Sequence, residues 1–137
     1  MIALDTNIWI YSHDTRDPAK QAAAQQLIGQ TRPLALPWQV GCEFVAASRK
    51  LQAQGFSEQQ AWLALTAMQS AVDVVLLPVV DLWSETHALL QRFALSFWDG
   101  LLIAACIRGG VLTLYSEDLG HLNKVDTLVI VNPFATP

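Results

Sequence analysis

Four acidic residues stand where apolar segments of this chain begin or end, at positions from which their carboxylates can meet. Asp5 ends the run "IALD", and Asp118 follows "VLTLY" within "SED". Asp99 opens the apolar segment "FWDGLLIAAC", and Glu43 lies in "PWQVGCEFVAASRKL". Carboxylate oxygens are the ligands that Mg²⁺ and Mn²⁺ prefer, whereas the scattered histidines and cysteines form no zinc motif. The four residues therefore indicate metal-ion chemistry in an acidic pocket.

Repulsion between carboxylates makes a cation the natural partner of such a pocket. Two charges about 4 Å apart, at an effective dielectric constant of about 20, cost about 4 kcal/mol. The cluster persists if some carboxyls stay protonated or if a divalent cation neutralises it. Either outcome requires the fold to bring the four side chains together.

Each carboxylate also has an ordinary structural explanation. Asp99 stands three residues after Ser96, which is the spacing of a capping box, and an acidic first turn suits the helix dipole. Asp5 and Asp118 suit turns or helix caps, and Glu43 suits a half-exposed helical position. Taken singly, each residue favours its structural explanation. Their convergence on one side of the fold favours the metal site.

The elements that must position these residues alternate between strands and helices. Strands are expected at 2–5, 34–36, 73–77, 111–115 and 127–131, and helices at 18–29, 38–54, 57–72, 81–94 and 97–109. Most of the strand segments lack apolar–polar alternation, as expected of parallel strands buried on both faces. We therefore predict one α/β domain over residues 1–137, a three-layer sandwich whose mostly parallel five-stranded sheet is flanked by helices.

The carboxyl ends of the strands are where open α/β sheets build their sites. Asp5 and Asp118 each follow a strand, and Asp99 opens the helix that returns to the start of the fourth strand, so all three belong to this edge. Glu43 lies on a helix that follows the second strand, roughly 70° from the centre of its apolar stripe at about 100° per residue. That stripe consists of Val40, Phe44, Ala47 and Leu51.

Composition restricts the class of protein. The chain has 137 residues, 53% of them hydrophobic and 15% charged, and no uncharged apolar run reaches the roughly 18 residues that span a bilayer. The opening "MIALDTN" lacks the basic start of a signal peptide, so we expect a cytoplasmic protein with Cys42 and Cys106 reduced and buried. The net charge of −4 argues against a simple cationic nucleic-acid binder, but not against a nucleic-acid enzyme whose acids hold cations.

The segment "FSEQQAWLALTAMQSAV" suggests self-association. Its apolar residues do not fit one narrow stripe, and they include Trp62, Leu63, Leu65, Met68 and Val72. A helix that is apolar on more than one face is either deeply buried or covered by a partner. We therefore expect a homodimer or higher homo-oligomer formed through this region.

Motifs at both ends of the chain resemble the PIN domain family, and more narrowly the VapC-type ribonuclease toxins of toxin–antitoxin pairs. They are "LDTNIWIY", the acidic helix after the second strand, "FWDGLLIAAC", "LYSEDLGHL" and "IVNPF". The resemblance covers nearly the whole chain. It implies hydrolysis of RNA phosphodiester bonds with one or two Mg²⁺ or Mn²⁺ ions, and inhibition by a cognate antitoxin protein.

The resemblance also implies roles for single residues. It implies four metal-binding and catalytic acids, namely Asp5, Glu43, Asp99 and Asp118. Asn7 and Ser116 match positions at which small polar residues support the acids, and Glu117 ranks behind its neighbour because extended backbone points it the other way. The chain departs from the family at Gly100, where Ala is commoner, and at Leu122, where Gly is common. Neither departure involves a proposed ligand.

Basic residues in the first third of the chain are candidates for holding RNA phosphates. They are Arg16, Lys20, Arg32, Arg49 and Lys50. The alternative explanation is ordinary surface charge, which charge reversal at one position distinguishes through the cleavage rate and its salt dependence.

Other protein classes remain as alternatives. A phosphoacceptor signalling domain needs an acidic pair after the first strand, an Asp after the third and a Lys after the fifth, whereas Asp5 stands alone, Asp81 suits a helix cap, and "VNPF" has no Lys. A haloacid-dehalogenase-type phosphatase needs a second Asp where Asn7 stands. A non-catalytic PIN-like scaffold also remains open, and metal-dependent RNA cleavage would distinguish the enzyme from it.

Overall fold

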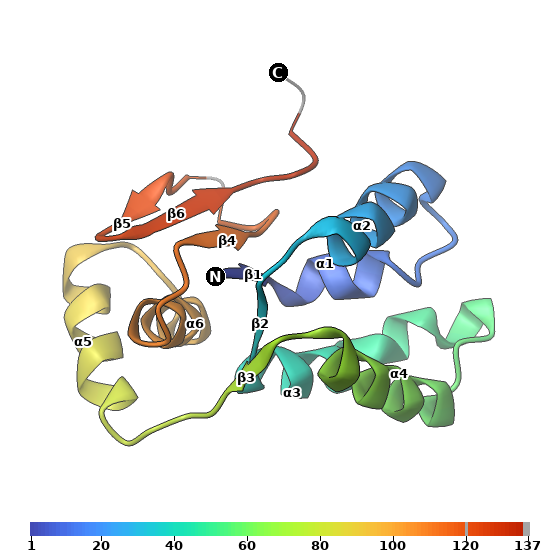
Figure 1. The fold of residues 1–137 in the computed structure, drawn as a ribbon, viewed down its shortest axis with the longest axis horizontal. Helices are drawn as coiled ribbons and strands as arrows, with labels where there is room; N and C mark the ends of the chain where they lie inside the picture. The colour runs from blue at the N-terminus through green and yellow to red at the C-terminus, as the bar shows by residue number, and fades with distance from the viewer. Residues whose placement is uncertain (120, 136–137) are drawn as a thin grey trace.

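A computed structural model describes residues 1–119 and 121–135 as a mixed α/β fold (Figure 1). The sheet has six strands in the order β3-β2-β1-β4-β6-β5, all parallel except the β5–β6 pair. The strands are β1 (Ile2–Leu4), β2 (Leu34–Pro37), β3 (Val74–Leu76), β4 (Thr113–Tyr115), β5 (Lys124–Val125) and β6 (Leu128–Val131). The helices are α1 (Thr6–Tyr11), α2 (Pro18–Gln30), α3 (Trp38–Ala47), α4 (Glu58–Ala71), α5 (Leu82–Arg92) and α6 (Phe97–Arg108), with a 3₁₀ helix η1 (Ser48–Gln54) after α3.

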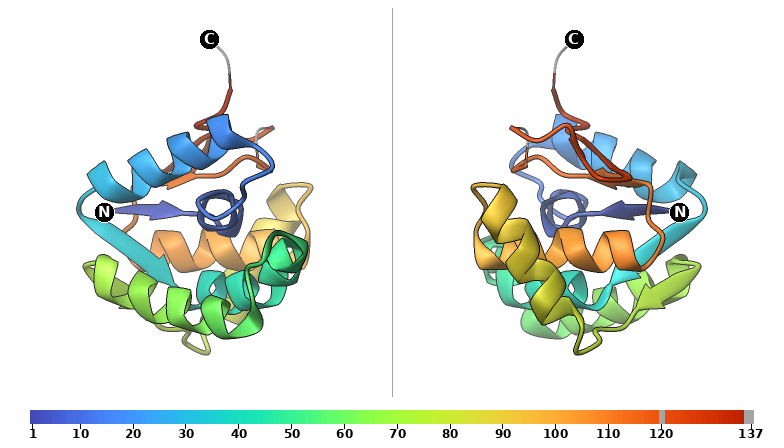
Figure 2. Two further views of the ribbon diagram at one scale, coloured as in Figure 1. Left: turned by 90° about the vertical axis from the view of Figure 1, so that its right-hand side faces the viewer. Right: turned by 90° about the vertical axis from the view of Figure 1, so that its left-hand side faces the viewer.

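Strand order explains how the helices form two outer layers. The chain moves from β1 to β2 to β3 in one direction and then returns to place β4 on the other side of β1. Because parallel crossovers are right-handed, α1 to α4 cover one face of the sheet, and α5 and α6 cover the other. Figure 2 shows α2 and α4 together in one view, and α5 beside α6 in the opposite view. Side chains of the central strands, such as Leu4, Leu36 and Leu114, are buried between these layers.

The α/β prediction is confirmed, with differences in the shortest elements. All five predicted strands and the five predicted helices are present to within a few residues. The sheet has a sixth strand, β5, which extends over two residues and forms an edge hairpin with β6. Helix α1 was not predicted, and the single helix expected over 38–54 is α3 followed by η1. Of the two free thiols, Cys106 is buried as expected, whereas Cys42 is exposed, because it lies on the side of α3 that lines an open pocket between α3 and α6.

In the described residues, no single helix is both long and apolar enough to cross a membrane; α5 and α6 meet those criteria only as a pair, bent by 116°.

Candidate metal centre

The four predicted acids come from four different elements near the carboxyl ends of β1, β2 and β4. Asp5 directly follows β1 and caps α1, while Asp118 follows β4. Glu43 lies in α3, which begins where β2 ends, and Asp99 lies in the first turn of α6. The parallel register of β1 with β2 and β4 brings these ends to one edge, as the sequence analysis expected.

Asp5 is the buried member of the group. Its Oδ1 accepts a hydrogen bond from the Thr6 backbone N–H at 2.6 Å, and its Oδ2 accepts one from Ser116 Oγ at 2.7 Å. Burial raises the pKa of Asp5 above its usual value, and the charges of Asp99 and Asp118 raise it further, although the two hydrogen bonds act in the opposite direction. The charges of Asp99 and Asp118 therefore act on the buried Asp5 carboxyl.

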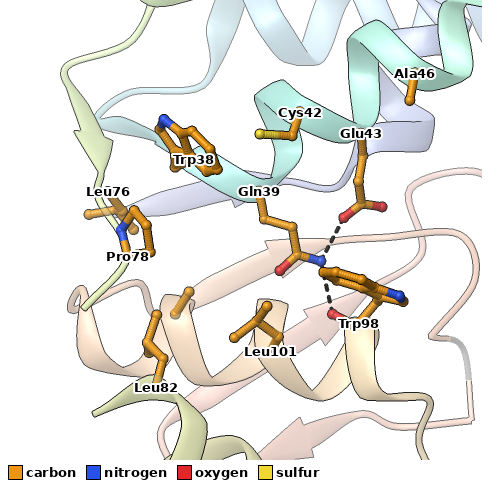
Figure 3. Close-up of a pocket in the computed structure, with 11 residues that line it drawn as sticks. Trp38, Gln39, Cys42, Glu43, Ala46, Leu76, Pro78, Leu82, Trp98 and Leu101 are labelled. Carbon is orange, nitrogen blue, oxygen red and sulfur yellow. Dashed lines mark hydrogen bonds between the residues drawn. The ribbon is translucent and has the colours of Figure 1, made fainter. Parts of the chain in front are cut away.

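Glu43 connects the group to α6. The side chain is half-buried, and its Oε1 accepts a hydrogen bond from Gln39 Nε2 at 2.6 Å (Figure 3). Gln39 Nε2 also donates to the backbone carbonyl of Trp98 at 2.9 Å, so one amide joins α3 to α6. Burial raises the pKa of Glu43, and the charges of Asp5 and Asp99 add to the effect. Gln39 was not predicted as a site residue, although it precedes Glu43 by four residues, the spacing at which helical side chains can form a hydrogen bond.

Asp118 is the exposed member, and Asp99 is partly buried like Glu43. The Asp99 backbone N–H donates to Ser96 Oγ at 3.2 Å, so Ser96 caps α6 and the Asp99 carboxylate takes no part in that bond. Asp118 Oδ2 accepts a hydrogen bond from Asn7 Nδ2 at 3.0 Å. The oxygen of that amide, Asn7 Oδ1, is buried and has no hydrogen-bond partner among the described residues.

The donor chemistry of this group fits a hard divalent cation. All the candidate ligands are oxygen atoms, and the mutual repulsion of the carboxylates is what a cation offsets. Within residues 1–119 and 121–135, however, no three Asp, Glu, His or Cys side chains lie close enough together to hold one ion. Shared ligation of a single ion therefore requires the carboxylates to move closer together than they stand here.

Glu117 binds neighbours in α1 and α2 rather than the acids, although its backbone forms a bend after β4 and not the extended strand on which the expectation rested. Its carboxylate accepts hydrogen bonds from Tyr11 Oη at 2.6 Å and from Lys20 Nζ at 2.6 Å. The hydrogen bond to Glu117 and a second one to Tyr11 raise the pKa of Lys20 to about 12. Lys20, a predicted RNA contact, is thus engaged in an ion pair, and Tyr11 is a partner that the sequence did not reveal.

The other basic candidates differ in their surroundings. Arg16 is paired with the buried Asp14 at 2.9 Å, and Arg32 donates to the Ile28 carbonyl at the end of α2 at 3.0 Å. Arg49 and Lys50 are exposed on η1. The structure therefore separates candidates held by neighbouring groups from the two that stand on an open surface.

Gly100, where the family more often has Ala, lies at the contact between α6 and α5. A Cβ atom at this position would lie 2.9 Å from Leu90 Cδ2 and 3.3 Å from Thr86 Cγ2. The Gly at this position therefore allows α6 and α5 to pack closely, immediately after Asp99.

Comparison with known proteins supports the same fold. The sequence model of the PIN domain family matches residues 2–128. A toxin–antitoxin complex from Klebsiella pneumoniae has a TM-score of 0.74 at 18% identity, covering 99% of this chain and 100% of that chain. VapC20 from Mycobacterium tuberculosis, described as a sarcin–ricin loop cleaving toxin, has a TM-score of 0.70 at 20% identity over 92% of this chain and 98% of that chain. VapBC2 from Rickettsia felis, bound to a DNA fragment from its promoter, has a TM-score of 0.69 at 17% identity over 96% and 98%. No curated protein matches the chain.

Proposed function

This chain belongs to the PIN domain family, and from that premise we propose that it is a metal-dependent endoribonuclease that hydrolyses RNA phosphodiester bonds. The observation that supports the proposal is that Asp5, Glu43, Asp99 and Asp118 all come from elements at the edge formed by the carboxyl ends of β1, β2 and β4. A VapC toxin of similar fold is described as cleaving an RNA loop, which supports RNA as the substrate class.

The proposed metal ligands are the four carboxylates, and the proposed ions are Mg²⁺ or Mn²⁺. When bound, such an ion lowers the pKa of a coordinated water and offsets negative charge on phosphate oxygens. The chain's own residues orient the ligands: Ser116 and the Thr6 backbone hold Asp5. The unpaired Oδ1 of Asn7 is a further neutral oxygen beside the acids. No side-chain nucleophile is required, and Ser116 acts by orienting Asp5.

The test is cleavage of single-stranded RNA by the purified protein in EDTA, Mg²⁺ or Mn²⁺. We expect cleavage only with a metal ion, and loss of cleavage in Asp5→Asn with the fold retained by circular dichroism. Ser116→Ala, which removes only an orienting bond, should lose roughly 10–100-fold. Glu58→Gln, an acid on α4 outside the group, serves as the control. Cleavage that persists in EDTA or in Asp5→Asn contradicts the proposal.

We also propose that the protein is the toxin of a toxin–antitoxin pair, inhibited by a cognate antitoxin. The support is that neighbours of similar fold are parts of toxin–antitoxin complexes. Expression in a host with and without the adjacent small gene, followed by sequencing of RNA ends, tests this directly. New RNA ends that appear only without that gene support the pair, and equal RNA ends in both strains contradict it.

A non-catalytic PIN-like scaffold is the second candidate function. The spacing of the carboxylates favours it, because no three of the described acidic, His or Cys side chains are within reach of one ion. A scaffold predicts that Mg²⁺ changes neither RNA integrity nor thermal stability. The phosphoacceptor alternative is disfavoured by the family match over residues 2–128.

A further inference from the structure

The side chain of Gln39 joins one proposed metal ligand to the helix that carries another. Gln39 lies on α3, and its Nε2 donates to Glu43 Oε1 at 2.6 Å and to the Trp98 backbone carbonyl at 2.9 Å (Figure 3). Trp98 directly precedes Asp99 in the first turn of α6. Both N–H groups of one amide are therefore committed to the two helices from which Glu43 and Asp99 extend.

The two acceptors determine which way the Gln39 amide faces. Turning the amide over would place its oxygen against the Glu43 carboxylate and the Trp98 carbonyl, neither of which donates, so the nitrogen must lie on that side. Gln39 Oε1 is buried and has no hydrogen-bond partner among the described residues. A buried acceptor without a partner lowers stability, and a methionine of similar shape would avoid that loss. The amide is therefore placed for the groups to which its nitrogen donates rather than for packing.

The hydrogen bond from Gln39 leaves Glu43 able to bind a cation. It engages Oε1, and the other carboxylate oxygen, Oε2, takes part in no hydrogen bond within residues 1–119 and 121–135. A half-buried glutamate has several rotatable bonds, and fixing them costs conformational entropy. An anchored amide restricts the positions of the carboxylate without using both of its oxygens.

Repulsion within the acidic group explains why Glu43 needs such a restraint. The charges of Asp5 and Asp99 add to burial in raising the pKa of Glu43, so its ionised carboxylate is pushed away from theirs. Glu43 is only half-buried, and solvent offers its flexible side chain an alternative position. The hydrogen bond to Gln39 opposes that movement, because Gln39 is itself held by the Trp98 carbonyl.

We propose that Gln39 is a positioning residue for metal binding, whose amide, anchored on the Trp98 carbonyl, holds the Glu43 carboxylate beside the other acids against their repulsion. The inference rests on the proposed metal site. Gln39 contacts neither the ion nor the RNA, and it acts through Glu43. Loss of the amide should therefore weaken metal binding, and only while Glu43 is present to be held.

Calorimetric titration of the metal-free protein with Mn²⁺ tests this role without any cleavage reaction. Gln39→Met keeps the length of the side chain but removes the donors, and it should weaken Mn²⁺ affinity roughly 10–100-fold. Gln25→Met is the matched control, because Gln25 Nε2 donates to the Ser12 carbonyl at 2.9 Å, at the other end of α1 from Asp5. The control should bind Mn²⁺ as the wild type does. An unchanged or tighter affinity in Gln39→Met overturns the proposal.

A double-mutant cycle with Glu43→Ala separates positioning from a general effect on the fold. In the Glu43→Ala background, Gln39→Met should cause no further loss of Mn²⁺ affinity, since no carboxylate remains to be held. The same four proteins are also unfolded in EDTA, where the two substitutions should be coupled by roughly tenfold in the unfolding equilibrium constant. An equal further loss of affinity, or the absence of coupling in EDTA, overturns the role of Gln39.

The positioning role and the proposed nuclease fail in different ways. A wild-type protein that binds Mn²⁺ but cleaves no RNA contradicts the nuclease, whereas a weaker Mn²⁺ affinity in Gln39→Met still supports the positioning role. Metal-dependent cleavage together with equal Mn²⁺ affinities in the wild type and Gln39→Met overturns the positioning role alone. A wild-type protein that binds no Mn²⁺ contradicts both.

Discussion

At the residue scale, Asp5 and Glu43 experience repulsion from neighbouring carboxylates that burial prevents them from relieving in water. Asp5 is buried and Glu43 half-buried, and burial is the main reason that the pKa of each carboxyl is raised. The charge of Asp99 raises the pKa of both. Asp99 is therefore the position at which the removal of one charge relieves two neighbours.

Asp99→Asn is expected to raise the thermal stability of the metal-free protein, because Asp5 and Glu43 then ionise at lower cost. The gain should be about 1 kcal/mol or less, the usual size of one charge–charge interaction between partly exposed groups. Unfolding in EDTA measures it, with Glu58→Gln as a control expected to stay within about 0.5 kcal/mol of the wild type. Added Mg²⁺ should reduce the difference in stability between Asp99→Asn and the wild type, because the ion stabilises the wild type more. A lower midpoint for Asp99→Asn in EDTA contradicts the repulsion.

Lys20 is expected to serve Glu117 rather than RNA, since its ammonium group is already held in the ion pair. Lys20→Ala should cost about 1 kcal/mol or less of stability, and nothing further once Glu117→Ala is present. RNA affinity is measured as a function of salt concentration in proteins that also carry Asp5→Asn, so that no cleavage occurs. The slope of log affinity against log salt should be unchanged by Lys20→Ala. Arg49→Ala, from an exposed site, should reduce the slope by about 0.7. A reduced slope in Lys20→Ala would show that the lysine contacts phosphate.

Individual residues were predictable where the signal was local. The start of α6 was predicted because Ser96 and Asp99 have the spacing of a helix cap, and the structure shows that Ser96 Oγ accepts a hydrogen bond from the Asp99 backbone N–H. The pairing of Lys20 with Glu117 joins residues 97 positions apart and leaves no periodic trace in the sequence. Contacts of that kind depend on which helix lies over which strand, which single-residue patterns do not encode.

At the element scale, length decided what the sequence revealed. The central strands are continuous apolar runs, and α4 and α5 extend over several turns, which is long enough to be recognised as helical even though the apolar residues of α4 do not form one stripe. Helix α1 has six residues and β5 has two, which is too short for either period to repeat. The break between α3 and η1 follows no Gly or Pro, so no local residue marked it.

The loop between α1 and α2 is anchored to η1 by one buried carboxylate. Asp14 accepts hydrogen bonds from Arg16 Nε at 3.0 Å and from Gln54 Nε2 at 2.9 Å. Gln54 in turn accepts from the Thr15 backbone N–H at 2.8 Å. The Arg16 hydrogen bonds are the main reason that the pKa of Asp14 lies far below its usual value. The ionised form of Asp14 therefore belongs to the folded loop.

Asp14→Asn is expected to destabilise the protein at pH 7 by about 1–3 kcal/mol, as for a buried charged hydrogen bond. Because the folded pKa is below the unfolded one, this stability is fully present above the unfolded value near 4. It is lost as the pH falls from there toward the folded value. Chemical unfolding of both proteins from pH 7 to pH 3 should show a difference that shrinks on acidification. A constant difference contradicts the linkage.

At the scale of the whole molecule, the site exists only because the two helical layers meet at one edge of the sheet. Glu43 comes from the layer of α1 to α4, and Asp99 comes from the opposite layer of α5 and α6. Gln39 spans the two, with one hydrogen bond to Glu43 and another to the Trp98 carbonyl. Opening of the α3–α6 contact would therefore separate Glu43 from Asp99.

Self-association remains a prediction, and the structure makes it testable on two surfaces. Helix α4 buries Met68 and leaves Trp62 54% exposed, so its apolar character divides between the core and an outer face. A second apolar surface surrounds Trp83, which is 70% exposed at the start of α5. If α4 forms the interface, Trp62→Glu should yield a monomer in sedimentation at micromolar concentration, while Trp83→Glu leaves the oligomer intact. The reverse result would place the interface at α5. Exposed apolar patches of this kind are expected to be covered in an oligomer, so a wild-type protein that sediments as a monomer refutes self-association.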